Sequence, residues 1–134
     1  MYISSHQIRV RYADTDQMGF VYYGNYAAFY EVGRVEAMRS LGFSYRKLEE
    51  SGVMMPVLNC HSNFLMPAKY DDLITIETSI PEMPSAKISF YYKISNETGK
   101  LIHTGQTTLA FMDKDTKRPV RPPKALLDIL TSYF

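Results

Sequence analysis

The segment from Asn25 to Leu41 constrains the fold of this chain more than any other. It has no proline and one interior glycine, Gly33, so it can form one uninterrupted helix. Its apolar side chains lie around most of a helical wheel rather than in one stripe: Ala27, Ala28, Phe29, Tyr30, Val32, Val35, Ala37, Met38 and Leu41. We therefore expect a long central helix that the rest of the chain wraps.

Five other segments alternate between apolar and polar residues, which is typical of strands with one buried face. They span residues 7–12, 53–64, 74–80, 86–95 and 101–112. The last three are joined by short turns and should pair antiparallel. Pro56 suggests a strand end or sheet edge, and Gly105 is a candidate bulge. The pattern predicts an α+β fold with a five-stranded antiparallel sheet around the helix.

Local signals complete this outline. Gly42 is a helix stop, and Ser44 is a candidate cap for a short helix that continues to Glu50. A final helix should run from Lys124 to about Leu130. With 134 residues and no repeats or linker, the chain is expected to form a single domain over residues 1–134.

Composition narrows the classes of function. Lys and Arg number 15 against 14 for Asp and Glu, so no overall field attracts nucleic acid or an anionic membrane. The single cysteine, Cys60, cannot form an internal disulfide. No signal sequence and no stretch of about 20 apolar residues is present. The expected location is the cytoplasm.

The stretch from Tyr12 to Tyr26 has the composition of an active site. It holds two carboxylates, Asp14 and Asp16, in a glycine-containing loop that leads into the central helix. A helix N-terminus offers free N–H groups to a carbonyl oxygen that gains negative charge, and a nearby carboxylate can act as nucleophile or general base. Together these features indicate acyl transfer.

Residues 14–26 (DTDQMGFVYYGNY) and 29–34 (FYEVGR) resemble the signature of the hot-dog-fold acyl-CoA thioesterases of the 4-hydroxybenzoyl-CoA thioesterase type. The resemblance implies a hot-dog fold and hydrolysis of an acyl-CoA to a free acid and coenzyme A, with no metal or redox cofactor. It also implies a homodimer paired edge to edge, with shared active sites, and a possible dimer of dimers.

By the same resemblance Asp16 is the catalytic carboxylate, and the backbone N–H of Tyr23, with Gly24 close behind, binds the thioester carbonyl. From the residues alone, Asp16 could instead cap the loop through an Asx turn. Asp14 is a weaker candidate, and an oxygen-ligand metal site lacks the rest of a calcium loop. A Tol-Pal-associated branch of the family carries histidine at the Tyr23 position, so acyl preferences of that branch do not transfer.

Glu31 and Arg34 are neighbours on one helix face. They indicate either a structural ion pair, at the surface or a subunit interface, or a second catalytic carboxylate at Glu31, as in another hot-dog lineage. No histidine has metal-ligand spacing; His61 could border the cleft but is more typical of a structural residue.

Two sets of residues are candidates for binding the substrate. The acyl pocket should be lined by Tyr22, Asn25, Tyr26 and Phe64, with Phe29, Met54 and Met55 as further walls. The phosphates of coenzyme A could be held by Lys87, Arg118 and Arg121, beside Lys117 and Lys124.

Two other functions stay open. The acyl group could be carried by acyl carrier protein, an acidic partner whose binding would depend on salt. Alternatively, the chain could bind acyl-CoA without catalysis. A hydratase fits less well, because that hot-dog branch pairs Asp with His in a different motif.

Overall fold

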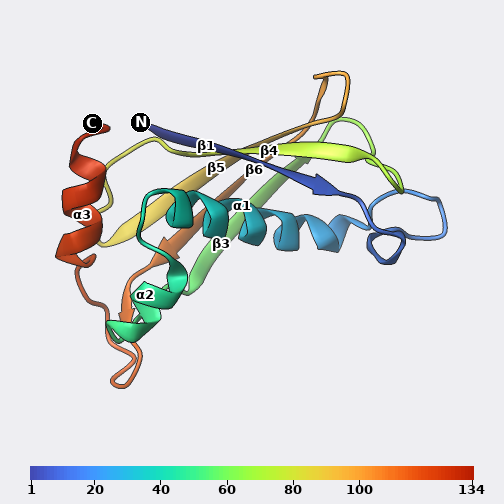
Figure 1. The fold of residues 1–134 in the computed structure, drawn as a ribbon. Coiled ribbons are helices and arrows are strands. Elements are labelled where there is room, and N and C mark those ends of the chain that lie inside the picture. Colours follow the sequence, from blue (N-terminus) through green and yellow to red (C-terminus); the bar gives the residue numbers. More distant parts are fainter.

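The computed structural model describes residues 1–134, in which one long helix packs on a five-stranded antiparallel sheet (Figure 1). The sheet has the order β1–β4–β5–β6–β3, with β1 Tyr2–Arg9, β3 Val57–Phe64, β4 Leu73–Ile80, β5 Lys87–Ser95 and β6 Leu101–Ala110. Strands β2 (Val53–Met54) and β7 (Met112–Asp113) form a second small sheet. The helices are α1 Tyr26–Ser40, α2 Tyr45–Glu50 and α3 Lys124–Thr131. The predicted α+β architecture is confirmed.

Three predicted strands differ from the structure by more than one residue. Strand β1 begins at Tyr2 rather than residue 7, and the predicted strand 101–112 is divided into β6, which ends at Ala110, and β7. Strand β1 ends at Arg9, and although Val10 is buried, Tyr12 is 78% exposed because the chain turns there into a short 3-10 helix, Tyr12–Asp14. The predicted strand 53–64 is divided into β2 and β3. Pro56, which has no N–H to donate to a ladder, lies between the two parts.

Two glycines let α1 approach the sheet closely. A Cβ at Gly33 would lie 2.5 Å from Oγ1 of Thr78 on β4, and a Cβ at Gly105 would lie 2.3 Å from the ring of Tyr30. Gly105 was predicted as a bulge, which is wrong: it pairs in continuous register with Tyr92 on β5 and Ser62 on β3. Its role is to leave room for the Tyr30 ring.

Within one chain α1 is covered on one side only. Its buried residues face the sheet: Tyr26, Phe29, Tyr30, Gly33, Arg34, Ala37 and Met38. Ala27, Ala28 and Glu31 are exposed, and Val32 and Val35 are half-buried. The helix also contacts β1, β4 and β5 more than it contacts β3, and all eight residues of β3 are exposed. The expectation of a helix wrapped by its own chain is therefore met on the sheet side alone.

The predicted local signals are confirmed. Gly42 follows α1 with φ of 82°, the left-handed conformation typical of a helix stop. The Ser44 side chain accepts a hydrogen bond from Lys47 N–H at the start of α2, and Leu126 and Leu130 bury the apolar face of α3. No helix here has both the length and the apolar character needed to cross a lipid bilayer.

Candidate active site

Asp14 anchors the loop between β1 and α1 through structural hydrogen bonds. The Asp14 carboxylate is buried and bonded to Arg11, whose backbone N–H donates to it at 2.9 Å and whose guanidinium lies 3.1 Å away. The Asp14 carbonyl accepts from Tyr22 N–H at 2.9 Å and from the Asn25 side chain at 2.8 Å. Asp14 and Asn25 thus hold the loop against the entry of α1, and both are occupied by structural contacts.

Asp16 lies on the turn of this loop and is half-buried. Its Oδ1 accepts a hydrogen bond from Met18 N–H at 2.9 Å, which is an Asx turn, and its own N–H donates to the Phe20 carbonyl at 2.9 Å. Gly19 completes the turn with φ of 78°. The carboxylate keeps its second oxygen, Oδ2, without a protein hydrogen bond, so the turn holds Asp16 without using up its capacity to act as a base.

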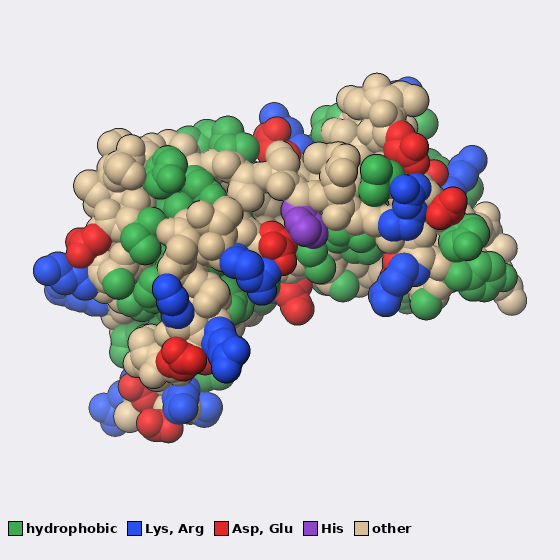
Figure 2. Space-filling model, viewed as in Figure 1, with side chains coloured by type: hydrophobic (Ala, Val, Ile, Leu, Met, Phe, Trp, Pro, Cys, Tyr) green, Lys and Arg blue, Asp and Glu red, His purple; other side chains and the backbone are tan.

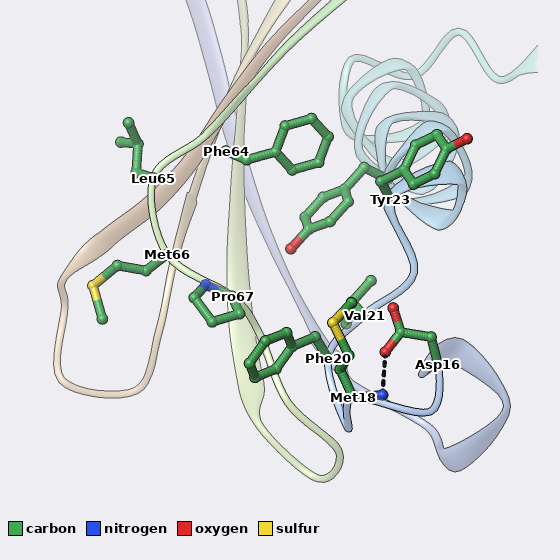
Figure 3. Close-up of a pocket in the computed structure, with 10 residues that line it drawn as sticks. Asp16, Met18, Phe20, Val21, Tyr23, Phe64, Leu65, Met66 and Pro67 are labelled. Carbon is green, nitrogen blue, oxygen red and sulfur yellow. Dashed lines mark hydrogen bonds between the residues drawn. The ribbon is translucent and has the colours of Figure 1, made fainter.

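A cavity of about 300 Å³ opens beside Asp16. Its walls come from the loop, the start of α1, the end of β3 and the turn after β3: Asp16, Met18, Phe20, Val21, Tyr23, Tyr26, Phe64, Leu65, Met66 and Pro67. Figure 3 shows Phe64, Leu65, Met66 and Pro67 on one side, across from Asp16 and Met18. The walls are mostly apolar, which suits an acyl group with a carboxylate at its mouth. Of the predicted site residues, the fold brings Asp16, Tyr23, Tyr26 and Phe64 together here.

The entry to α1 offers two free backbone donors next to this cavity. A 3-10 turn, Tyr23–Asn25, leads into the helix, and neither Tyr23 N–H nor Gly24 N–H donates to a protein acceptor. A Cβ at Gly24 would lie 2.8 Å from the ring of Tyr22, so a larger residue there would displace that exposed ring or the turn itself. Unpaired N–H groups at a helix start suit a developing oxyanion.

An aromatic and polar layer backs the cavity. The Tyr26 ring stacks on His103 at 4.0 Å between centroids, and Phe64 meets His103 edge to face at 4.9 Å. The Tyr30 hydroxyl bonds to Nε2 of His103 and lies 2.7 Å from Oγ of Ser62. Burial lowers the pKa of His103 to about 4 and raises the pKa of Tyr30 to about 12, so both are neutral at pH 7.

The prediction did not include part of the lining: Met18, Phe20, Val21 and the turn Leu65–Pro67. These side chains come from segments far apart in the sequence, which meet at the β-bridge between Phe20 and Lys69 and at the end of β3. His103 was set aside among scattered histidines. Its place on the inward-facing rows of β6 was the one available signal.

Several candidate pocket residues lie outside this cavity within one chain. Met54 and Met55 line a different cavity, of about 270 Å³, beside Tyr45 of α2. Phe29 is buried in the core, and Tyr22 is 46% exposed over Gly24 rather than in the cavity wall. His61 points away from the helix, because the alternate residue Ser62 is the one that contacts Tyr30.

The predicted phosphate-binding residues lie at the other end of the sheet (Figure 1). On β6, His103 pairs with Phe64 at the cavity, whereas Ala110 pairs with Lys87. These positions are separated by about 23 Å at ~3.3 Å per strand residue. Arg121 lines a cavity of about 520 Å³ near Lys87, together with Ser85, and Arg118 lies on a nearby turn where basic and acidic side chains mix (Figure 2). One chain alone does not bring these residues to Asp16.

Glu31 and Arg34 do not form the predicted ion pair within the helix, and neither lines the cavity. Arg34 turns toward the sheet and is buried near Tyr45 and Tyr92, whereas Glu31 is exposed. Nowhere do three or more His, Cys, Asp or Glu side chains gather as metal ligands would.

Known proteins share this sequence and fold. A sequence profile of the thioesterase-like superfamily matches residues 10–130. "Putative acyl-CoA thioesterase YneP" of Bacillus subtilis is 35% identical over 133 residues, covering 99% of this chain and 96% of the relative. Acyl-CoA thioester hydrolase YbgC of Escherichia coli is 32% identical over 120 residues, which are 90% of each chain. The crystal structure of DHNA-CoA thioesterase from Staphylococcus aureus superposes with a TM-score of 0.87 at 35% identity, covering 100% of this chain and 85% of that one. The expected hot-dog fold is thereby confirmed.

Proposed function

The chain belongs to the thioesterase-like superfamily and is an acyl-CoA thioesterase, and we propose that it cleaves the thioester at the cavity beside Asp16. The products are a free carboxylic acid and coenzyme A. The observation that carries this proposal is the pairing of a carboxylate that keeps a free oxygen, Asp16, with the two unpaired N–H groups at Tyr23 and Gly24.

Asp16 supplies the acid–base chemistry. As a general base, Oδ2 takes a proton from water while the water oxygen attacks the thioester carbon; the C–S bond then breaks, and the proton returns to the sulfur of coenzyme A. As a nucleophile, Asp16 forms an acyl-enzyme anhydride, releases the thiolate and is freed by water. Mass spectrometry of acid-quenched enzyme separates the two routes, because only the second adds the mass of the acyl group.

The entry to α1 stabilises the negative charge. The carbonyl oxygen of the thioester accepts hydrogen bonds from the N–H groups of Tyr23 and Gly24, at the positive end of the helix dipole. Since the donors are backbone groups, the Tyr23 side chain matters less than the turn that Gly24 permits. The walls formed by Tyr26 and Phe64 hold the acyl group in place.

A homodimer would complete the substrate site. Strand β3 is the edge of the sheet and is exposed along its whole length. If two β3 edges pair antiparallel about a two-fold axis, the far end of one sheet comes to the cavity end of the other. Lys87, Arg118 and Arg121 of the second copy would then lie on the side from which the phosphates of coenzyme A approach Asp16. A dimer of dimers and a cytoplasmic location are further parts of this proposal.

Thiol release from a panel of short, long, branched and aromatic acyl-CoAs tests the proposed activity. We expect hydrolysis of at least one class. If no acyl-CoA is hydrolysed, the assay is repeated with acyl carrier protein as the carrier, where turnover that falls with salt would favour the alternative carrier. Binding of acyl-CoA without turnover of any thioester would contradict the proposal and favour the non-catalytic binding module.

A further inference from the structure

Arg34 is a buried cation that lacks an acid within its own chain. The residue is 8% exposed, its Nε is buried without a hydrogen-bond partner, and it takes part in none of the chain's four ion pairs. The hydroxyl of Tyr45, which lies beside the guanidinium, is also buried without a partner. Burying a charged group without a hydrogen-bond partner is unfavourable, so an acidic acceptor from outside the chain would stabilise the Arg34 guanidinium.

Glu31 carries an unused carboxylate on the same side of α1. Residues three apart on a helix differ by about 60° around the axis. Tyr30 marks the direction, because its hydroxyl reaches Ser62 on the edge strand β3, whereas Gly33 on the opposite flank contacts Thr78 on β4. Around the helix axis, Arg34 and then Glu31 follow Tyr30 in the direction of the free edge. The exposed Glu31 lies on the side that a neighbour across that edge would meet, and Arg34 is buried next to that side, near Tyr45 and Tyr92.

The position of the free edge fixes which part of α1 this neighbour would meet. Strand β3 spans Val57–Phe64, so its midpoint falls between Cys60 and His61. Ser62, next to that midpoint, is the β3 residue that bonds to Tyr30. Two β3 edges paired antiparallel about the midpoint would place the segments 30–34 of the two α1 helices at the same level along the paired strands, running in opposite directions.

We propose that Glu31 and Arg34 form two reciprocal ion pairs between the α1 helices of a homodimer, Glu31 of each copy binding Arg34 of the other. The proposal rests on the edge-to-edge dimer described above. It gives Arg34 the acid that its own chain does not provide, and it makes Glu31 an interface residue rather than a second catalytic carboxylate. Tyr26, which lines the cavity, is eight residues before Arg34, or about 12 Å along the helix.

Charge exchange tests the pairing. In Glu31→Arg, and likewise in Arg34→Glu, two like charges face each other at both symmetric positions, and the dimer dissociation constant from sedimentation equilibrium should rise about 10- to 100-fold. The double variant Glu31→Arg/Arg34→Glu should return to within a few-fold of the wild-type value. Glu36→Arg is the matched control, because Glu36 lies on the other side of α1, where it pairs with Arg39, and its change should leave dimerisation unaffected.

Mixing the two single variants gives a second readout. A heterodimer of Glu31→Arg and Arg34→Glu chains restores opposite charges at both positions, so native mass spectrometry should show heterodimers in excess over both homodimers. Should Arg34→Glu not fold, Glu31→Gln serves instead, and it should weaken the dimer and reduce its dependence on salt. The inference is overturned if the double variant dimerises no better than the single ones, or if Glu31→Gln changes neither quantity. A wild-type chain that stays monomeric also overturns it and removes the dimer from the proposed function. The role of Asp16 is judged separately, from thiol release by wild type and Asp16→Asn in the same state of assembly.

Discussion

Asp16 accepts the Met18 N–H at 2.9 Å with one carboxylate oxygen and leaves the other free of protein contacts. The bond fixes the side chain at the mouth of the cavity, where it faces the turn after β3 (Figure 3). The Asx turn thus uses one oxygen of the Asp16 carboxylate, and the proposed role as general base or nucleophile falls to the other. A substitution that keeps the accepting oxygen but removes the charge, such as Asp16→Asn, therefore separates the structural role of Asp16 from its proposed catalytic role.

Adding a methyl group at Gly24 should impair turnover more than binding. Its Cβ would lie 2.8 Å from the Tyr22 ring, so Gly24→Ala displaces either the ring or the turn that aims the Tyr23 and Gly24 N–H groups. We expect kcat to fall at least about tenfold, given that losing one oxyanion donor costs ~10²–10³. Steady-state thiol release measures it, and Gly24→Ala/Tyr22→Ala should recover activity. Tyr23→Phe, which keeps the backbone donor, should stay near the wild-type rate; an inactive Tyr23→Phe would contradict the backbone assignment.

Packing should outweigh helix propensity at Gly33. Alanine is favoured over glycine in a helix by about 1 kcal/mol. A Cβ at Gly33, however, would lie 2.5 Å from Thr78 Oγ1, and overpacking typically costs about 1–3 kcal/mol. Gly33→Ala should therefore lower the free energy of unfolding in urea. Gly33→Ala/Thr78→Ala should regain much of the loss, because Oγ1 of Thr78 has no hydrogen-bond partner to forfeit. A single variant as stable as wild type would refute the close approach.

The stability of the fold should fall in acid because of His103. Burial depresses its folded-state pKa to about 4, below the usual ~6.5 of the unfolded chain. The unfolded state thus binds more protons between these values, so stability is fully present above about pH 6.5 and is lost as pH falls toward 4, by an amount on the order of 3 kcal/mol. Urea midpoints against pH measure this. The profile should flatten in His103→Gln and stay unchanged in His61→Gln, whose imidazole is exposed.

Cys60 reports on the edge of the sheet. It is the only thiol of the chain and is exposed on β3, close to the midpoint of the free edge. In the proposed dimer this edge is covered, so the rate of modification by a thiol reagent should fall as protein concentration rises through the dimer dissociation constant. A rate independent of concentration, in a protein shown to be dimeric, would place the interface elsewhere. Protein unfolded in urea provides the unprotected rate.

The alternation of residues predicted most of the fold, because it depends on local geometry. Ile74, Ile76 and Ile80, for example, are buried on β4 as expected. Contacts between distant segments could not be derived in this way. In the sequence Gly105 suggested a bulge, whereas in the fold it leaves room for the ring of Tyr30. Met54 and Met55 precede β3, whose eight residues separate them from the cavity at Phe64.

The candidate site likewise has one part that the local sequence predicts and another that it does not. The motif around Asp16 is a continuous stretch, so the loop, the turn and the helix entry could be predicted together. Lys87, Arg118 and Arg121 were grouped with it by chemistry alone, and one chain holds them at the opposite end of the sheet. Pairing of two β3 edges in a dimer would bring the two groups of residues together. The edge position of β3 depends on the order of all five strands, which no local sequence pattern contains.

The most direct test of the catalytic assignment compares wild type with Asp16→Asn in thiol release from the best acyl-CoA of the panel. Asparagine keeps the oxygen that accepts the Met18 N–H but loses the basic and nucleophilic carboxylate, so the fold should persist while kcat falls about 10²- to 10⁴-fold. Asp16→Ala, which loses both, should also be less stable. A folded Asp16→Asn protein that hydrolyses the same thioester at the wild-type rate would contradict the role of Asp16.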